Sequence, residues 1–148
     1  MSHMAFQWLQ MRIQEERERR EKRAKHLARL PGALEELYTH LAECVEAYTE
    51  TFGASSADIV MLSNRVRITS REQVDGTWKP AAKVEVSTIP ELPGFLIERG
   101  ELKMPIEVGL LPSDKLFYRD NEADKYINME ELTRRILDRI LFPGLKDQ

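Results

Sequence analysis

Two groups of side chains in this sequence have types and spacings that could do chemistry. His40 and Cys44 stand four residues apart, which would place them on one face of a helix and could pair a thiol with a base. A short segment of alternating carboxylates could form a calcium loop: Asp120, Glu122 and Asp124. Both groups also have plainer explanations. Cys44 adjoins an apolar stripe, so we expect a buried and unreactive thiol. The acidic segment lacks the glycine and the terminal glutamate of an EF-hand, so we expect a solvated loop.

Arg65 and Arg67 form a third candidate site. They would share one face of a strand, and their guanidinium groups could hold an anionic ligand if the sheet enclosed a pocket there. The competing interpretation is that both are exposed and pair across strands, for example Arg67 with Glu85. The sequence favours the second interpretation, and Arg65 and Arg67 stay as candidate ligand-binding residues.

The local motifs of common active sites are absent from the sequence. It has no glycine-rich dinucleotide fingerprint, no phosphate-binding loop and no nucleophile elbow. The two internal histidines, His26 and His40, have no cysteine or carboxylate at the spacing of zinc ligands. We therefore expect no catalytic residue, no metal and no cofactor. Whether the chain is an enzyme stays open, with the balance against it.

Composition indicates one ordinary domain with an uneven charge distribution. The chain has 148 residues, of which 42% are hydrophobic, enough to bury a core. A single cysteine and the lack of an apolar run long enough to cross a bilayer lead us to expect a cytoplasmic protein that does not bind membranes. The net charge of −3 conceals an asymmetry. Residues 1–30 carry eight Lys or Arg and four Glu, whereas residues 31–58 carry six acidic residues and no Lys or Arg.

Both of these oppositely charged segments are predicted to be helical. Residues 5–30 lack Gly and Pro and consist mainly of helix formers, and residues 33–52 place apolar side chains at helical spacing. Because Pro31 disfavours helical geometry in the residue before it, we expect the first helix to end there. The short connection favours an antiparallel helical hairpin over residues 1–56, with the acidic helix beside the basic one. Residues 1–4 could be an expression scar.

The first helix is predicted to be longer than the second, so that its free end overhangs. Large apolar residues gather near this end: Phe6, Trp8, Leu9, Met11 and Ile13. They either fold onto the remaining domain or contact another chain, and the sequence leaves both alternatives open. They are our candidate partner-binding residues.

Residues 57–148 are expected to form an antiparallel meander of about five strands and a terminal helix, continuous with the hairpin in one domain. Alternating apolar side chains predict one strand over residues 58–69 and a last strand over residues 116–119. Arg99-Gly100 is expected to be the loop of a hairpin. Asn128 can cap the terminal helix, whose apolar face should cover the sheet. The predicted fold class is therefore α+β.

The register of the first β-hairpin can also be predicted. Asp75-Gly76 marks its turn. We expect a three-residue loop, residues 75–77, because it places Ile68 opposite Val84 and Val74 opposite Trp78.

These features favour a non-enzymatic protein-interaction protein, such as an adaptor, chaperone or assembly factor, that acts through the apolar-tipped first helix. The expected partner is another protein or a second copy of the chain in a homodimer. The first alternative is a small-ligand-binding protein or enzyme with a cavity between a curved sheet and the helices. The second alternative is nucleic-acid binding through the basic first helix, which is disfavoured because four glutamates interrupt its positive charge.

Overall fold

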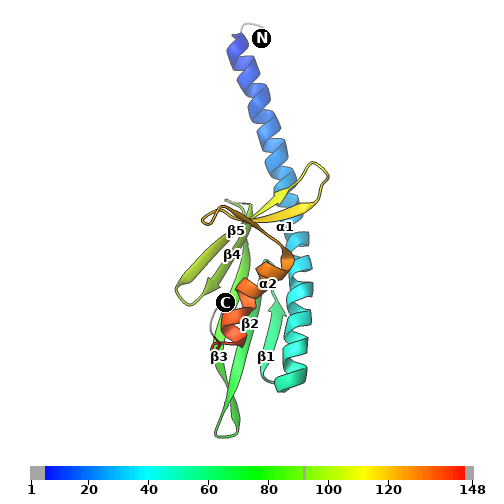
Figure 1. Cartoon of the computed structure of the whole chain (residues 1–148). Helices are drawn as coiled ribbons and strands as arrows, with labels where there is room; N and C mark the ends of the chain where they lie inside the picture. Colours follow the sequence, from blue (N-terminus) through cyan, green and yellow to red (C-terminus); the bar gives the residue numbers. More distant parts are fainter. Residues whose placement is uncertain (1–5, 92, 146–148) are drawn as a thin grey trace.

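The computed structural model of the chain describes residues 6–91 and 93–145. Residues 1–4, considered above as an expression scar, lie outside these ranges. The described chain has an α+β architecture: a long N-terminal helix, a seven-stranded antiparallel sheet and a C-terminal helix (Figure 1). The predicted fold class is confirmed at this level, although the helical hairpin and the strand count are not.

The N-terminal helix α1 runs without interruption over Gln7–Phe52, with Pro31 inside it. The predicted hairpin of two antiparallel helices is therefore wrong. Proline cannot donate the amide hydrogen bond of a helix interior, and this usually costs about 3 kcal/mol. In α1 the apolar stripe passes through the proline without a change of phase, from Leu27 and Leu30 to Leu34 and Leu37. Burial of this continuous stripe against the sheet offsets the lost hydrogen bond.

The position of Pro31 explains why the helix tolerates it. Pro31 and Gly32 are exposed, whereas Leu30 and Ala33 beside them are buried. The ring therefore points away from the sheet, and the core packing of α1 is undisturbed. A consequence is that the basic and acidic segments lie end to end in one rod and not side by side.

The sheet is a simple meander in which each strand pairs with its neighbours in the chain. Its strands are β1 (Ala57–Met61), β2 (Arg65–Val74), β3 (Thr77–Ile89), β4 (Gly94–Arg99), β5 (Leu102–Leu110), β6 (Leu116–Asp120) and β7 (Lys125–Ile127). The strand predicted over residues 58–69 is divided into β1 and β2 by a turn. The predicted last strand is confirmed as β6, and β7 after it was not predicted.

The predicted register of the first long hairpin is correct in its centre and wrong at its turn. Ile68 faces Val84 as expected, but Val74 faces Thr77 and not Trp78. The turn has two residues, with Asp75 and Gly76 both at positive φ, and a bulge between Ser70 and Arg71 restores the register. The second hairpin also differs, because Arg99 belongs to β4 and pairs with Leu102.

One face of the sheet is covered by both helices, and the other is open. Alternate residues of the strands, such as Val66, Ile68 and Val84, are fully buried in a single core with α1 and the C-terminal helix α2 (Met129–Leu141). The predicted cap of α2 is confirmed, since the Asn128 side chain accepts a hydrogen bond from the Glu131 amide at 2.8 Å. Helix α2 covers β2 and β3 and also contacts α1, as its apolar face required.

Candidate functional site

The first part of α1 projects from the domain as a free helical arm, which we define as residues 6–21 (Figure 1). Just after it, two polar contacts join α1 to the sheet region. Arg23 donates a hydrogen bond to the Pro90 carbonyl at 3.1 Å, and Lys25 pairs with Asp114 at 3.1 Å. At a rise of 1.5 Å per residue, the arm extends about 22 Å beyond this anchor.

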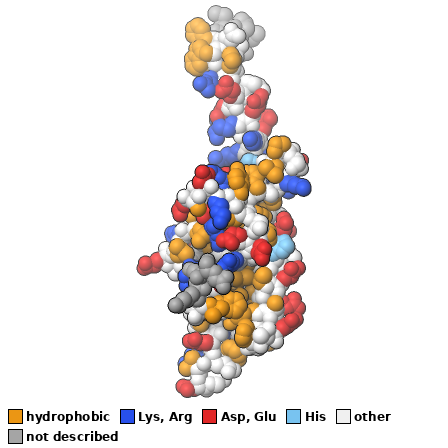
Figure 2. Space-filling model, viewed as in Figure 1, with side chains coloured by type: hydrophobic (Ala, Val, Ile, Leu, Met, Phe, Trp, Pro, Cys, Tyr) orange, Lys and Arg blue, Asp and Glu red, His pale blue; other side chains and the backbone are white. Residues whose placement is uncertain are grey.

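The predicted partner-binding residues lie at the free end of the arm and are all exposed. We call this set the apolar tip: Phe6, Trp8, Leu9, Met11 and Ile13. Trp8 keeps 64% of its surface accessible and Met11 keeps 58%. Figure 2 shows the hydrophobic side chains gathered at the end of the arm. The rest of the arm, which we call the shaft, carries side chains of both charges. The structure thus does not fold them onto the domain, the first of the two alternatives left open by the sequence.

Charged side chains hold the shaft of the arm in a helical conformation. The Glu16 carboxylate accepts hydrogen bonds from Arg19 at 2.7 and 2.8 Å and from Arg20 at 2.8 Å. These two guanidinium groups lower the pKa of Glu16 to about 2. Because the shaft is also continuous with the anchored part of α1, the arm presents its tip at a fixed distance from the domain.

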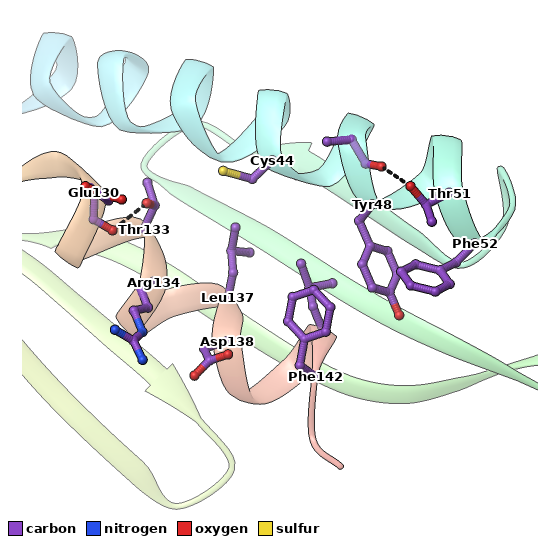
Figure 3. A pocket seen from close by; sticks show the side chains of 12 residues that line it. Cys44, Tyr48, Thr51, Phe52, Glu130, Thr133, Arg134, Leu137, Asp138 and Phe142 are labelled. Carbon is purple, nitrogen blue, oxygen red and sulfur yellow. Dashed lines mark hydrogen bonds between the residues drawn. The ribbon is translucent and has the colours of Figure 1, made fainter. Parts of the chain in front are cut away.

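A second apolar surface lies in a groove between α1 and α2 (Figure 3). We call it the helix groove; it has a volume of about 500 Å³. Leu137 and Leu141 form its buried floor. Aromatic side chains close one end, where the Tyr48 ring lies 4.8 Å from that of Phe52 and 5.6 Å from that of Phe142.

Cys44 and Ala47 form the α1 wall of the helix groove. The prediction of a buried Cys44 is wrong, since this side chain is exposed and points into the groove (Figure 3). Partial burial and the nearby Glu43 carboxylate raise the pKa of the Cys44 thiol, which disfavours the reactive thiolate. His40 precedes Cys44 by one helical turn but is not among the residues that line the groove.

The helix groove was not found from the sequence. It depends on how α2 docks beside α1, and these helices are about eighty residues apart in the chain. One local signal does point to it. Phe142 follows the apolar stripe of α2 and precedes the Pro143-Gly144 stop, so the helix ends in an aromatic side chain that has no place in the core.

Arg65 and Arg67 lie on the open face of the sheet and not in a pocket of the helix side. Both pair with Glu85, at 3.4 Å for Arg65 and 3.2 Å for Arg67. This is the cross-strand pairing that the sequence favoured over a ligand site. A shared carboxylate partly neutralises both guanidinium groups, so an anion would have to compete with Glu85.

The acidic segment after β6 is a structured turn in which one carboxylate is buried. Asp120 accepts hydrogen bonds from the backbone amides of Glu122 and Ala123, both at 3.1 Å, and pairs with Arg135 of α2 at 2.6 Å. Asp124 pairs with Arg119. The expectation of a solvated loop is therefore wrong for Asp120, whose carboxylate fastens this turn to α2.

Two further observations concern the residues that the structure describes. Within them, no three His, Cys, Asp or Glu side chains come together in an arrangement that could hold a metal ion. No helix in the same ranges has both the length and the apolar character needed to cross a bilayer.

Comparisons of the chain with protein-family models, with curated proteins and with solved structures found no match. The geometry of the arm and of the helix groove is therefore the basis for a functional proposal.

Proposed function

We propose that this chain is a protein-interaction protein that associates with its partner through the apolar tip of the arm. The observation that carries the proposal is the exposure of five large apolar side chains at the end of a helix that extends away from its own domain. The proposed role is that of an adaptor, chaperone or assembly factor. The partner is another protein or a second copy of the chain, in the cytoplasmic setting expected from the sequence.

The physical argument rests on the cost of leaving the tip in water. Full burial of one Leu, Ile or Phe side chain is worth roughly 1.5–3 kcal/mol. A rigid arm lets a partner gain this free energy without first ordering a flexible segment. Exposed apolar side chains are common singly, but a cluster on an extended element is typical of contact surfaces.

The other functions considered from the sequence gain less support. Fully buried side chains such as Leu37, Phe95 and Ile136 occupy the space between the sheet and the helices, where a ligand cavity was considered. On the arm, Glu16 pairs with Arg19 and Arg20. Local pairs of this kind reduce the field available to a nucleic-acid phosphate.

Photo-cross-linking tests the proposal directly. The full chain would carry benzoylphenylalanine in place of Met11 and be irradiated in the cells that produce it. The control is a chain that carries benzoylphenylalanine in place of Leu102, another exposed apolar residue, which lies on the body. We expect an adduct from position 11, with itself or another protein, and its loss in the Leu9→Gln/Ile13→Gln variant. Glutamine keeps the helix and removes the apolar surface. Absence of a position-11 adduct, together with a monomeric mass by light scattering, would overturn the proposal.

A further inference from the structure

A surface pocket lies between α2 and the β4–β5 hairpin and has a volume of about 340 Å³. We call it the arginine pocket, because four of the described arginines line it: Arg99 at the end of β4 and Arg134, Arg135 and Arg139 on α2. Two carboxylates, Glu131 and Asp138, also belong to the lining. The charged residues of the lining therefore carry a net charge of +2.

Arg99 is on the face of the sheet that packs against the helices. Phe95 and Ile97, which precede it at two-residue spacing on β4, are both buried in the core. Arg99 continues this row at the last residue of the strand, where the apolar core ends. Its positive charge is thus brought to the side of a helix that already presents three arginines.

Two of the four arginines lack a carboxylate partner among the residues that the structure describes. Arg135 pairs with Asp120 at 2.6 Å and with Glu131 at 3.2 Å. No such ion pair or hydrogen bond joins the side chain of Arg99 or Arg134 to another described residue. The pocket therefore holds more positive charge than its own acidic residues neutralise.

The arrangement of the α2 side chains adds to this excess. Because Glu131 is already paired, Asp138 is the remaining carboxylate of the lining. Figure 3 shows the Arg134 and Asp138 side chains pointing away from α1. Arg135 and Arg139 stand one helical turn apart, and like charges at this spacing repel each other. A bound anion would relieve the excess of positive charge.

We propose that the arginine pocket binds a small molecule through a phosphate group, as in a phosphate ester or a diphosphate. Guanidinium groups form paired, charge-assisted hydrogen bonds with phosphate oxygens. The arginines approach from β4 and from α2, which suits a tetrahedral group that accepts hydrogen bonds in several directions. A volume of about 340 Å³ is within the range of small-molecule pockets. The partly buried Met104 side chain of the lining can contact apolar atoms of the ligand.

Calorimetric titration of the full-length protein with pyrophosphate, at constant ionic strength, tests the proposal. Binding should saturate with one ion per chain. Arg99→Gln and Arg134→Gln should each weaken it at least about tenfold, because each removes charge-assisted hydrogen bonds. Neither side chain is bonded to another described residue, so urea denaturation should show that both variants keep the stability of the wild type. Arg17→Gln, which removes the same charge from an exposed position on the arm, is the matched control and should bind as the wild type does.

The pattern across the variants decides the result. Loss of affinity in both pocket variants, with wild-type affinity in Arg17→Gln, supports the proposal. Equal weakening in all three variants overturns it, because pyrophosphate would then respond to the overall charge of the protein and not to this pocket. The proposal is also overturned if the wild type shows no saturable binding, or if both pocket variants bind as the wild type does.

Asp138→Asn tests the pocket in the opposite direction. This substitution removes a carboxylate that repels an incoming phosphate, so the affinity for pyrophosphate should rise several-fold. Glu43→Gln removes a carboxylate from an exposed position on α1 outside the pocket and should leave the affinity unchanged. Equal affinities of these two variants would contradict the proposal.

Discussion

Asp120 and Arg135 form an ion pair that ties the end of β6 to α2, with a carboxylate oxygen 2.6 Å from a guanidinium nitrogen. Asp120 also accepts two backbone amide hydrogen bonds within its own turn. Its carboxylate thus satisfies donors from two elements at once. Removing it would leave the Glu122 and Ala123 amides without this acceptor and the partly buried Arg135 guanidinium with Glu131 as its remaining carboxylate partner.

Asp120→Ala is expected to lower the free energy of unfolding by about 1–3 kcal/mol, because partly buried donors lose their acceptor. The measurement is urea denaturation followed by circular dichroism. Glu122→Ala, in the same turn but with an exposed side chain, is the control and should change stability by less than about 0.5 kcal/mol. Equal effects of the two substitutions would show that the Asp120–Arg135 pair does not fasten the turn.

The same carboxylate predicts a pH dependence of stability. Burial favours the neutral form of Asp120, but hydrogen bonds from Arg135 and from the Ala123 and Glu122 amides outweigh it, so the pKa of Asp120 is lowered. The unfolded chain therefore binds this proton more readily, and stability should rise with pH in the acidic range. The contribution is complete above the ordinary aspartate pKa and is lost as the pH falls through the lowered value.

Comparison of wild type with Asp120→Asn from pH 6 to pH 2 isolates this term from the other carboxylates. The difference in unfolding free energy between the two proteins should shrink as the pH falls. A constant difference would mean that the Asp120 pKa is the same in the folded and unfolded chains.

Two glycines should respond to alanine in opposite directions. A Cβ atom on Gly94 would lie 2.1 Å from the Ile106 carbonyl oxygen of the neighbouring strand, so Gly94→Ala must move backbone and should destabilise the fold by about 1–3 kcal/mol. Gly32 is an exposed residue inside α1 with open space around it. Gly32→Ala should therefore stabilise the protein by about 0.5–1 kcal/mol. Thermal unfolding of both variants is the measurement, and the same sign for both would be inconsistent with these environments.

Pro31→Ala is expected to stabilise the protein, because alanine supplies the amide donor that an uninterrupted helix needs at this position. The gain should be about 1–3 kcal/mol, since an interior proline costs about 3 kcal/mol and alanine adds flexibility to the unfolded chain. The measurement is the midpoint of urea denaturation. A loss of stability would indicate that the chain needs a break at Pro31, as in the hairpin predicted from the sequence.

The prediction of a helical hairpin failed because the local signal of Pro31 was given more weight than the apolar periodicity on both sides of it. Pro31 is a sound local reason to end a helix, but the spacing of Leu27, Leu30, Leu34 and Leu37 continues through it. That continuity required one surface to receive the whole stripe, and only the sheet is long enough. The partner of the stripe is a tertiary property, which the proline motif could not reveal.

The β-sheet shows how a correct register can follow from an incorrect turn. Pairing Ile68 with Val84 was predictable because both must face the core. The one-residue offset needed for this pairing was assigned to the loop, whereas the chain absorbs it in a bulge beside Ser70. Hydrophobic alternation fixes which residues face inward but not where an extra residue is accommodated.

The candidate site was likewise predicted only in part from the sequence. The members of the apolar tip were recognisable because they end a charged helix, a property of neighbouring residues. The helix groove needed the docking of α2 against α1, and the exposure of Cys44 followed from that docking. Sequence patterns therefore found one of the two surfaces and missed the one formed by distant segments.

The uninterrupted meander also has a consequence for how this protein folds during its synthesis. Each strand finds its partner only a few residues away, so the sheet can grow one hairpin at a time as the polypeptide leaves the ribosome. Helix α1 is synthesised first yet must wait for β1–β5 before its leucines are covered. Its glutamate–arginine pairs can stabilise its helical conformation during that interval. The nascent chain would then expose a long helix before the sheet has folded.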